Sequence, residues 1–203
     1  MPRHNAHIDE KLIQAGLDLV SCEGIKSLSV RKICQKAGAN LGMFSYFFKD
    51  KETYLKCLFS TIHLKMDIFL GMDQVQDKNT LERLHHFCRH LIHFAFEHMY
   101  LLRAILVDFT MDDSLYQRYL EKGILPPMID LLELVKHAQG QGFLTNEASA
   151  EEIEEYLIFS CIMPLLFPNI GQFTKKQYVY KRKELSYYYD KFDRVMKELE
   201  VKQ

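Results

Sequence analysis

Apolar residues recur every three or four positions along almost the whole chain, and this helical periodicity is the feature that most limits its fold. Turn-bounded runs of β-branched residues, which would indicate strands, are missing. The chain has 203 residues, of which 48% are hydrophobic, and this is enough to bury a substantial core. The sequence therefore predicts an all-α globular fold.

Two short helices joined by a tight turn are predicted within residues 29–51, SVRKICQKAGANLGMFSYFFKDK. Ile33 lies on the inner face of the first helix, and Phe44 and Phe48, four residues apart, share the inner face of the second. Between the helices, Gly38 can adopt the left-handed conformation that such a turn needs. This pattern is typical of a helix-turn-helix, whose second helix enters the major groove of DNA.

The longer segment SVRKICQKAGANLGMFSYFFKDKETYL resembles the N-terminal domain of the tetracycline-repressor (TetR) family of bacterial regulators, in register from about Ile8 to Leu58. The resemblance implies a three-helix DNA-binding domain over residues 1–58. A long helix would join it to an all-helical ligand-binding and dimerisation domain over residues 59–203. It further implies a homodimer, not an enzyme, that binds a palindromic double-stranded DNA operator. The regulator is expected to be a repressor, with activation left open, and a small apolar or amphipathic effector would release it.

Carried over position by position, the resemblance assigns DNA contacts to the two short helices and their flanks. Arg31 matches a base-contacting position of the namesake repressor, and Lys51 matches the family's phosphate-binding lysine. Met43 and Ser45 stand where the family commonly has Thr and Tyr, so we expect weaker phosphate contacts and partly apolar reading of the bases. The predicted DNA-binding residues are Ser29, Arg31, Asn40, Leu41, Met43, Ser45, Tyr46 and Lys51.

Capping signals divide the chain into helices. Ser29, Asn40 and Asp50 are suited to cap the second, third and fourth helices, because their side-chain oxygens can accept from the first free N–H groups. Ser149 and Glu152 have the spacing of a capping box. The helices outside the two short ones are predicted over residues 7–22, 51–70 (the fourth helix), 80–97, 100–111, 114–140, 150–167 and 175–199. The Pro126-Pro127 pair should break the helix over 114–140 near Leu125.

The second domain is expected to hold an effector and a partner subunit. An apolar lining from its middle helices is consistent with an effector pocket, for which the predicted residues are Phe87, Leu91, Phe94, Ile105, Phe109, Met111 and Met128. The all-round apolar character of residues 154–167 and an aromatic stripe on the last helix favour a four-helix dimer interface. The predicted interface residues are Tyr156, Ser160, Leu185, Tyr188, Tyr189, Phe192 and Met196.

A row of imidazoles on one predicted helix raises an alternative. His86, His90, His93 and Glu97 share one face and could bind a metal, although a partly solvated polar face is the simpler explanation and the one we favour. We predict no metal site, no cofactor and no catalytic residue, because no complete catalytic or metal motif is found. The alternative function is a helical metal- or small-molecule-binding protein without a DNA role.

Charge and cysteine usage are consistent with a cytoplasmic regulator. Residues 1–58 hold nine Lys and Arg and six Asp and Glu, a net charge of +3, beside −4 for the remainder. The five cysteines are scattered and form no C-x-x-C pair, as expected for reduced thiols. The N-terminus lacks an apolar signal core, and prolines interrupt the uncharged stretch 156–173, so neither secretion nor a membrane span is predicted.

Overall fold

Turns and short irregular segments join the elements of the computed structural model, and all its regular elements among the described residues are helical. No strand forms there, and only an isolated antiparallel bridge between Leu144 and Glu200 has β geometry. The predicted all-α fold is therefore confirmed. None of the helices in this part of the chain combines the length and the hydrophobicity that crossing a bilayer requires. The structure describes residues 7–110, 125–167 and 183–201.

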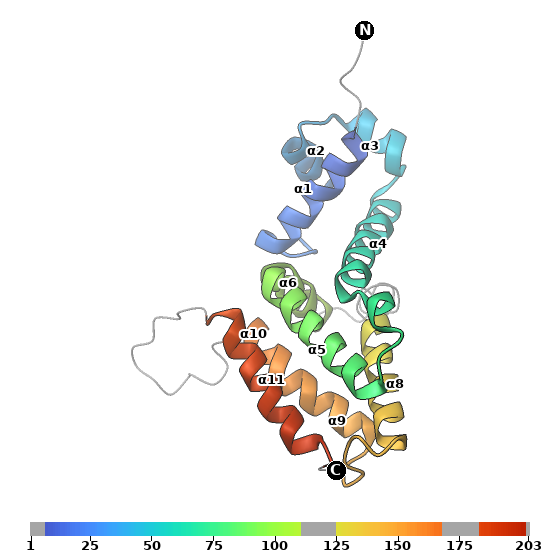
Figure 1. The fold of residues 1–203 in the computed structure, drawn as a ribbon. Coiled ribbons are helices and arrows are strands. Elements are labelled where there is room, and N and C mark those ends of the chain that lie inside the picture. The colour runs from blue at the N-terminus through green and yellow to red at the C-terminus, as the bar shows by residue number, and fades with distance from the viewer. Residues whose placement is uncertain (1–6, 111–124, 168–182, 202–203) are drawn as a thin grey trace, which may run out of the picture. The chain divides into compact units, whose positions relative to one another are not determined.

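The first of two compact units contains the chain up to Lys65 together with the segment that begins at Tyr100. Helices α1, α2 and α3 pack on one another within it (Figure 1). Leu12, Ile33 and Phe44 are almost fully buried between them. The helices are α1 (Ile8–Glu23), α2 (Val30–Ala37), α3 (Leu41–Phe48), α4 (Lys51–Leu70) as far as Lys65, and α6 (Met99–Thr110) from Tyr100.

Three of these helices begin at the residues that the capping signals predict. In each case a side-chain oxygen accepts a hydrogen bond from a backbone N–H three residues on, which satisfies a donor that the helix leaves free. These bonds run from the N–H of Lys32 to Ser29 Oγ (3.2 Å), from that of Met43 to Asn40 Oδ1 (2.9 Å) and from that of Thr53 to Asp50 Oδ1 (2.7 Å).

The second unit contains residues 66–99 and the chain from Leu125 onwards. Helix α5 contacts α8, α11 and the turn η2, and α8 also contacts α9 (Figure 1). The Pro126-Pro127 pair lies in the first turn of α8, where its missing N–H groups are tolerated. The elements are η1 (Met72–Val75, a 3₁₀ turn), α5 (Thr80–Glu97), α8 (Leu125–Gly140), α9 (Ala150–Leu157), η2 (Ile158–Ile162, a π-helical turn), α10 (Met163–Leu166) and α11 (Leu185–Leu199).

The helix predicted over residues 150–167 forms from Ala150 to Leu166, but it contains an irregular turn that the sequence pattern does not predict. Residues Ile158–Ile162 form a π-helical turn, in which the N–H of Met163 donates to the carbonyl of Ile158. Pro164 has no N–H, and in a regular helix its ring would collide with the carbonyl four residues before it. The wider turn relieves this conflict and lets the chain continue as α10.

The last helix begins at Leu185, so its predicted start near Lys175 is wrong. Lys183 and Glu184 are described and are not helical; Glu184 has extended backbone angles at the helix boundary. These two charged residues add no apolar side chain to the buried face of α11, so packing gives them no reason to join the helix. Residues 168–182, and residues 111–124 of the predicted helix 114–140, lie outside the described part of the chain.

Candidate nucleic-acid interface

A glycine in the left-handed conformation connects α2 to α3. Gly38 has φ 65° and ψ 29°, which an L side chain rarely adopts. Its N–H donates to the carbonyl of Gln35, and the N–H of Ala39 donates to that of Cys34, so the last carbonyls of α2 are satisfied. The cap at Asn40 then starts α3 at once. The predicted helix-turn-helix geometry is present.

One face of α3 is fixed in the core by aromatic contacts. The rings of Phe44 and Phe48 lie 5.5 Å apart, and each contacts Tyr54 of α4, at 5.2 Å and 5.0 Å between centroids. The Tyr54 hydroxyl donates a 2.8 Å hydrogen bond to the carbonyl of Leu12 in α1, and burial raises the pKa of this phenol. Helix α3 is therefore anchored to both neighbouring helices.

The other face of α3 is open to solvent. Tyr46 is 82% exposed and Leu41 58% exposed, Ser45 is also exposed, and Met43 is half-buried. Phe47, which we did not predict as part of the site, is partly exposed and its ring meets that of Tyr46 edge to face at 5.1 Å. The available signal was that Phe47 is out of phase with the buried pair four residues apart.

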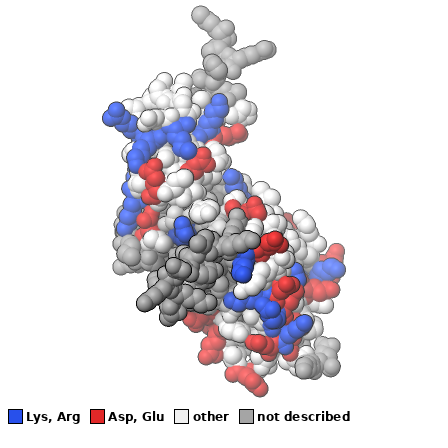
Figure 2. Space-filling view, turned by 90° about the vertical axis from the view of Figure 1, so that its left-hand side faces the viewer, with Lys and Arg blue, Asp and Glu red and all other residues white. Residues whose placement is uncertain are grey.

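The first unit carries several exposed cations, and two lysines of α2 are already paired with carboxylates of α1. Figure 2 shows Lys and Arg side chains gathered over the first unit, with acidic side chains beside them. Lys32 Nζ lies 2.6 Å from Glu23 Oε2 and lowers the pKa of that carboxyl, mainly through the hydrogen bond. Lys36 Nζ lies 3.5 Å from Asp18 Oδ2. Arg31 is exposed, and no ion pair of Arg31 is found within the described ranges.

Three predicted DNA-binding residues have structural contacts of their own. Ser29 and Asn40 are the caps of α2 and α3, so one acceptor site of each side chain is occupied. Lys51 Nζ donates a 2.5 Å hydrogen bond to the carbonyl of Leu28, which sequence reasoning did not predict. Since an ammonium group has three donors, two N–H groups of Lys51 remain for other acceptors.

The turn between α3 and α4 holds a second exposed cation in an unusual conformation. Lys49 has φ 61° and ψ −59°, and the N–H of Asp50 donates to the carbonyl of Phe48 at 2.6 Å across it. These features define a γ-turn, which is strained for a residue with a side chain. The turn places Lys49 directly after α3, close in sequence to the exposed aromatic pair.

The predicted effector residues are mostly core residues. Phe87, Phe94 and Ile105 are almost fully buried, and Leu91 borders a small internal cavity. Met128 is half-buried. The side chain of Phe109 and the whole of Met111 lie outside the described residues.

The predicted interface residues separate into a buried and an exposed group. Tyr188, Phe192 and Met196 are at most 3% exposed and pack in the core of the second unit, so they are not available to a partner subunit. The exposed aromatic residues are Tyr156 from the predicted set, Phe159 three residues after it, and Tyr187 on α11; Ser160, Leu185 and Tyr189 are half-buried.

The row of imidazoles on α5 contacts backbone carbonyls and rings. His86 Nε2 lies 2.8 Å from the carbonyl oxygen of Leu70, and His90 Nδ1 lies 2.8 Å from that of His86. The His93 ring meets Phe69 edge to face at 4.9 Å. Among the residues that the structure describes, no three His, Cys, Asp or Glu side chains are grouped so as to hold a metal.

A helix-turn-helix with an exposed second helix is typical of DNA-binding proteins. We therefore compared the chain with known proteins. No protein-family model matches the chain. Over 118 residues it is 23% identical to the Probable HTH-type transcriptional regulator YttP of Bacillus subtilis (strain 168), and the match spans 57% of this chain and only 57% of that protein.

Solved structures share the fold over the whole chain. A TetR family transcription regulator from Marinobacter aquaeolei VT8 matches with a TM-score of 0.67 and 16% identity, covering 100% of both chains. The Flavonoid-responsive Regulator FrrA matches with a TM-score of 0.61 and 16% identity, covering 97% of this chain and 99% of that one. The chain thus has the fold of TetR-family transcriptional regulators.

Proposed function

We propose that the protein is a TetR-type transcriptional regulator that binds DNA through α3. The observation that carries this proposal is the division of α3 into two faces. Phe44 and Phe48 hold one face in the core, while Leu41 and Tyr46 expose large side chains that no neighbouring helix covers in the described unit. A helix so anchored presents its outer face rigidly, as insertion into the major groove requires.

Base recognition combines one polar and several apolar contacts. Arg31 is exposed and can donate two hydrogen bonds to O6 and N7 of a guanine. Leu41, Met43 and Tyr46 offer apolar surface to thymine methyl groups. Ser45 and the two remaining N–H groups of Lys51 are suited to phosphate oxygens, and the capping residues Ser29 and Asn40 hold the two helices in place for these contacts.

We infer that two copies bind a palindromic operator in the cytoplasm. A single short reading helix makes few phosphate contacts and so binds weakly, whereas a two-fold dimer doubles them. Tyr156, Ser160, Phe159 and Tyr187 would form the dimer interface. Phe159 is 57% exposed on η2, and the Tyr156 hydroxyl donates to Glu198 Oε2 at 3.0 Å, which joins α9 to α11 on the surface that would meet the partner.

Repression with release by a small apolar or amphipathic effector completes the proposal. It rests on the resemblance of the N-terminal segment to the family and on the fold shared with a regulator whose name describes it as flavonoid-responsive. An effector that binds one conformation of the body more tightly shifts the population towards it. If the two heads are then wrongly spaced for the half-sites, DNA affinity falls.

In vitro selection from random double-stranded DNA with the full chain tests the proposal directly. We expect a two-fold symmetric site to be enriched. Loss of a bidentate arginine contact is worth about 1–3 kcal/mol, so Arg31→Ala should weaken binding by about 5- to 150-fold and relax specificity at one position of each half-site. Tyr46→Ala should also weaken it. Lys197→Ala removes an exposed charge from α11 in the second unit and is the matched control.

Two results would reject DNA binding through α3. One is a selection that enriches no sequence. The other is a binding curve for Arg31→Ala and Tyr46→Ala that coincides with those of the unaltered chain and of Lys197→Ala. Either result would favour the alternative of a helical small-molecule- or metal-binding protein.

A further inference from the structure

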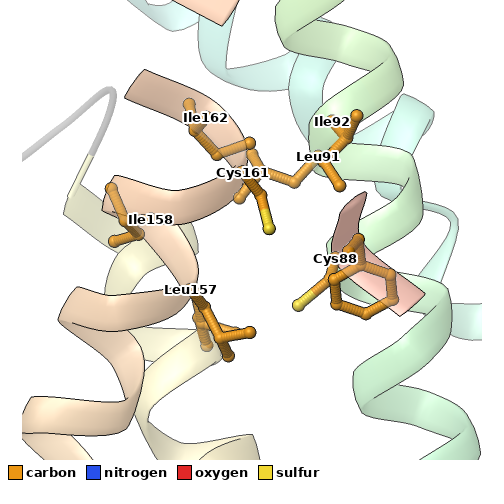
Figure 3. Close-up of a pocket in the computed structure, with 9 residues that line it drawn as sticks. Cys88, Leu91, Ile92, Leu157, Ile158, Cys161 and Ile162 are labelled. Carbon is orange, nitrogen blue, oxygen red and sulfur yellow. The ribbon is translucent and has the colours of Figure 1, made fainter. Parts of the chain in front are cut away.

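A small cavity lies inside the second unit, between α5 and the π-helical turn η2 (Figure 3). It measures about 10 Å³, which is close to the space that one water molecule needs. Aliphatic side chains, the ring of Phe192 and two cysteines enclose it, and no nitrogen or oxygen atom is exposed on its wall. A buried water requires two to four polar partners, so this cavity does not suit water.

Two sulfur atoms face one another across this cavity. Figure 3 shows the thiols of Cys88, from α5, and Cys161, from η2, pointing into the same space from opposite sides. Both residues are at most 5% exposed. The two side chains come from elements that are distant in the sequence, and it is the fold that brings them together.

The position of Cys161 depends on the π-helical turn. Such turns widen a helix locally and recur at functional sites. Here Pro164 accounts for the presence of the turn, and the turn carries Cys161 on its buried side, opposite α5. The same irregularity that interrupts the helix therefore supplies one half of the thiol pair.

The apolar environment keeps both thiols protonated in the absence of a bound cation. Burial raises the pKa of Cys88 far above that of a free thiol, and it raises that of Cys161 to about 11. The positive charge of Lys191 acts in the opposite direction on Cys161. Because thiolate is the reactive form, attack by solvent oxidants is slow at such a site.

We propose that Cys88 and Cys161 bind a single Cu(I) ion between their sulfur atoms. Soft sulfur ligands select soft cations, and Cu(I) is stable with two thiolates in a line. Zn²⁺ would need four ligands, and no imidazole or carboxylate lines the cavity. The size of the cavity suits one ion and excludes a larger ligand.

The exchange balances in charge and protons, and no atom changes its oxidation state. One Cu⁺ replaces the protons of two thiols, so a bis-thiolate complex with a net charge of −1 forms and two protons leave to solvent. A buried negative charge needs a nearby positive one, and Lys191 is the cation whose field already reaches Cys161. Binding would join α5 to η2 through one metal bridge.

Anaerobic titration of the reduced full chain with Cu(I), in competition with the chelator bathocuproine disulfonate, tests this proposal. We expect each chain to retain one Cu(I) that contributes sulfur-to-copper absorption in the ultraviolet, and X-ray absorption to report two sulfur neighbours. Since two protons are released, the apparent affinity should rise about 100-fold for each unit of pH below the thiol pKa values.

Single cysteine variants decide where the ion is bound. Cys88→Ser and Cys161→Ser should each abolish chelator-resistant retention. Cys34→Ser should keep it, because Cys34 is also buried but belongs to the first unit. Circular dichroism checks that the variants fold. Cys161→Ala removes the same sulfur without placing a hydroxyl group in the apolar core, so it serves if Cys161→Ser does not fold.

Three outcomes would overturn the proposal. These are retention that neither Cys88→Ser nor Cys161→Ser reduces, a stoichiometry of zero in the folded chain, or a Cys88–Cys161 disulfide found by peptide mass spectrometry after the same treatment. No DNA enters the measurement, so its result is independent of whether the protein binds an operator.

Discussion

Tyr54 is the residue on which the packing of the first unit converges. Its side chain is fully buried, its ring contacts Phe44 and Phe48 of α3, and its hydroxyl donates to the carbonyl of Leu12. The close approach of α4 to α1 depends on Gly16, because a Cβ at this position would lie 1.9 Å from the Tyr54 hydroxyl oxygen. The packing of α4 on α1 therefore depends both on the hydrogen bond of Tyr54 and on the absence of a side chain at Gly16.

We expect Gly16→Ala to lower the free energy of unfolding by about 1–3 kcal/mol, because the added methyl group overpacks the core. In a Tyr54→Phe background the same substitution should cost less, since the atom that it would strike is gone. Urea unfolding of the four chains of this double-mutant cycle measures both values. Gly140→Ala is the control, because a Cβ there meets nothing within 4 Å. Equal costs of Gly16→Ala in both backgrounds would contradict the expected contact.

Residues that act through local spacing were predictable, and those that act through distant contacts were not. The spacing of Phe44 and Phe48 placed them in the core, where both are buried. Lys51 was expected only at a phosphate, yet its ammonium also holds the carbonyl of Leu28, a partner 23 residues away in sequence. No local pattern reveals such a pair, because the partner is a backbone oxygen that every residue type carries.

Helix α6 is tied to the end of α1 by one carboxylate. Asp108 Oδ2 accepts hydrogen bonds from the N–H groups of Ile25 at 2.5 Å and Lys26 at 3.2 Å. Gly24, with φ 82°, lets the chain turn directly beside this carboxylate. The segment between α1 and α2 is thus fixed by an element that follows it by about eighty residues.

Replacing the carboxylate should loosen that segment. We expect Asp108→Ala to lower the stability of the first unit by about 1.5–3 kcal/mol, the usual range for hydrogen bonds to a charged group. Hydrogen exchange read by mass spectrometry should show faster exchange in peptides that cover residues 24–28. Arg103→Ala on the same helix is the control. Unchanged exchange at residues 24–28 would mean that the carboxylate does not hold the turn.

The capping box of α9 makes part of the stability of the second unit dependent on pH. The N–H of Ser149 donates to Glu152 Oε2 at 2.7 Å and its hydroxyl does so at 2.9 Å, and these bonds lower the pKa of the Glu152 carboxyl. A lowered folded-state pKa stabilises the fold above the unfolded-state value of about 4.3. The contribution is lost as the pH falls through the folded-state pKa.

Glu152→Gln should therefore reduce thermal stability at neutral pH, and the difference from the unaltered chain should shrink as the pH falls below about 4. Melting curves recorded by circular dichroism between neutral and acidic pH measure this difference. Glu155→Gln, on the same helix but outside the capping box, is the matched control. A difference that stays constant with pH would exclude the carboxylate as its source.

Elements whose boundaries depend on nearby residues were predicted well, and the others were not. The caps at Ser29, Asn40 and Asp50 each bond an N–H three residues away, so their signal is contained in the sequence. The turn η2 reflects a compromise between Pro164 and the packing of the helix around it, which periodicity alone does not describe. The bridge between Leu144 and Glu200 joins distant segments and has no local signal at all.

The proposed dimer is the property of the whole molecule that can be tested most simply. Phe159→Lys would place two charges in the two-fold interface and should weaken self-association by about 100-fold or more. Sedimentation equilibrium at micromolar concentrations measures the change. Ile129→Lys alters an equally exposed apolar residue on α8, at 58% against 57%, and is the control. An unaltered dimer in Phe159→Lys, or an equal effect of Ile129→Lys, would place the interface elsewhere.

For the whole molecule, the sequence pattern predicts the fold class but does not separate surfaces buried within the chain from surfaces open to a partner. Periodicity identified the apolar face of α11, and Tyr188 and Phe192 are indeed buried. Whether an apolar face packs within its own chain or against a second copy depends on the position of the other helices, which no single helix encodes. The pattern of α11 therefore predicts an interface for the whole aromatic stripe, whereas Tyr188 and Phe192 lie in the core and Tyr187 is exposed.

In the proposed complex with DNA, two lysines of α2 would approach the phosphates with counterions already in place. Lys32 and Lys36 are paired with Glu23 and Asp18, which are fixed anions of the protein and cannot diffuse away. The salt dependence of DNA affinity reports the mobile ions that binding releases into solution. If these pairs persist in the complex, the logarithm of the affinity should fall less steeply with the logarithm of the salt concentration than the lysines and arginines of the first unit would suggest. The protein would then hold its operator over a wider range of cellular ionic strength.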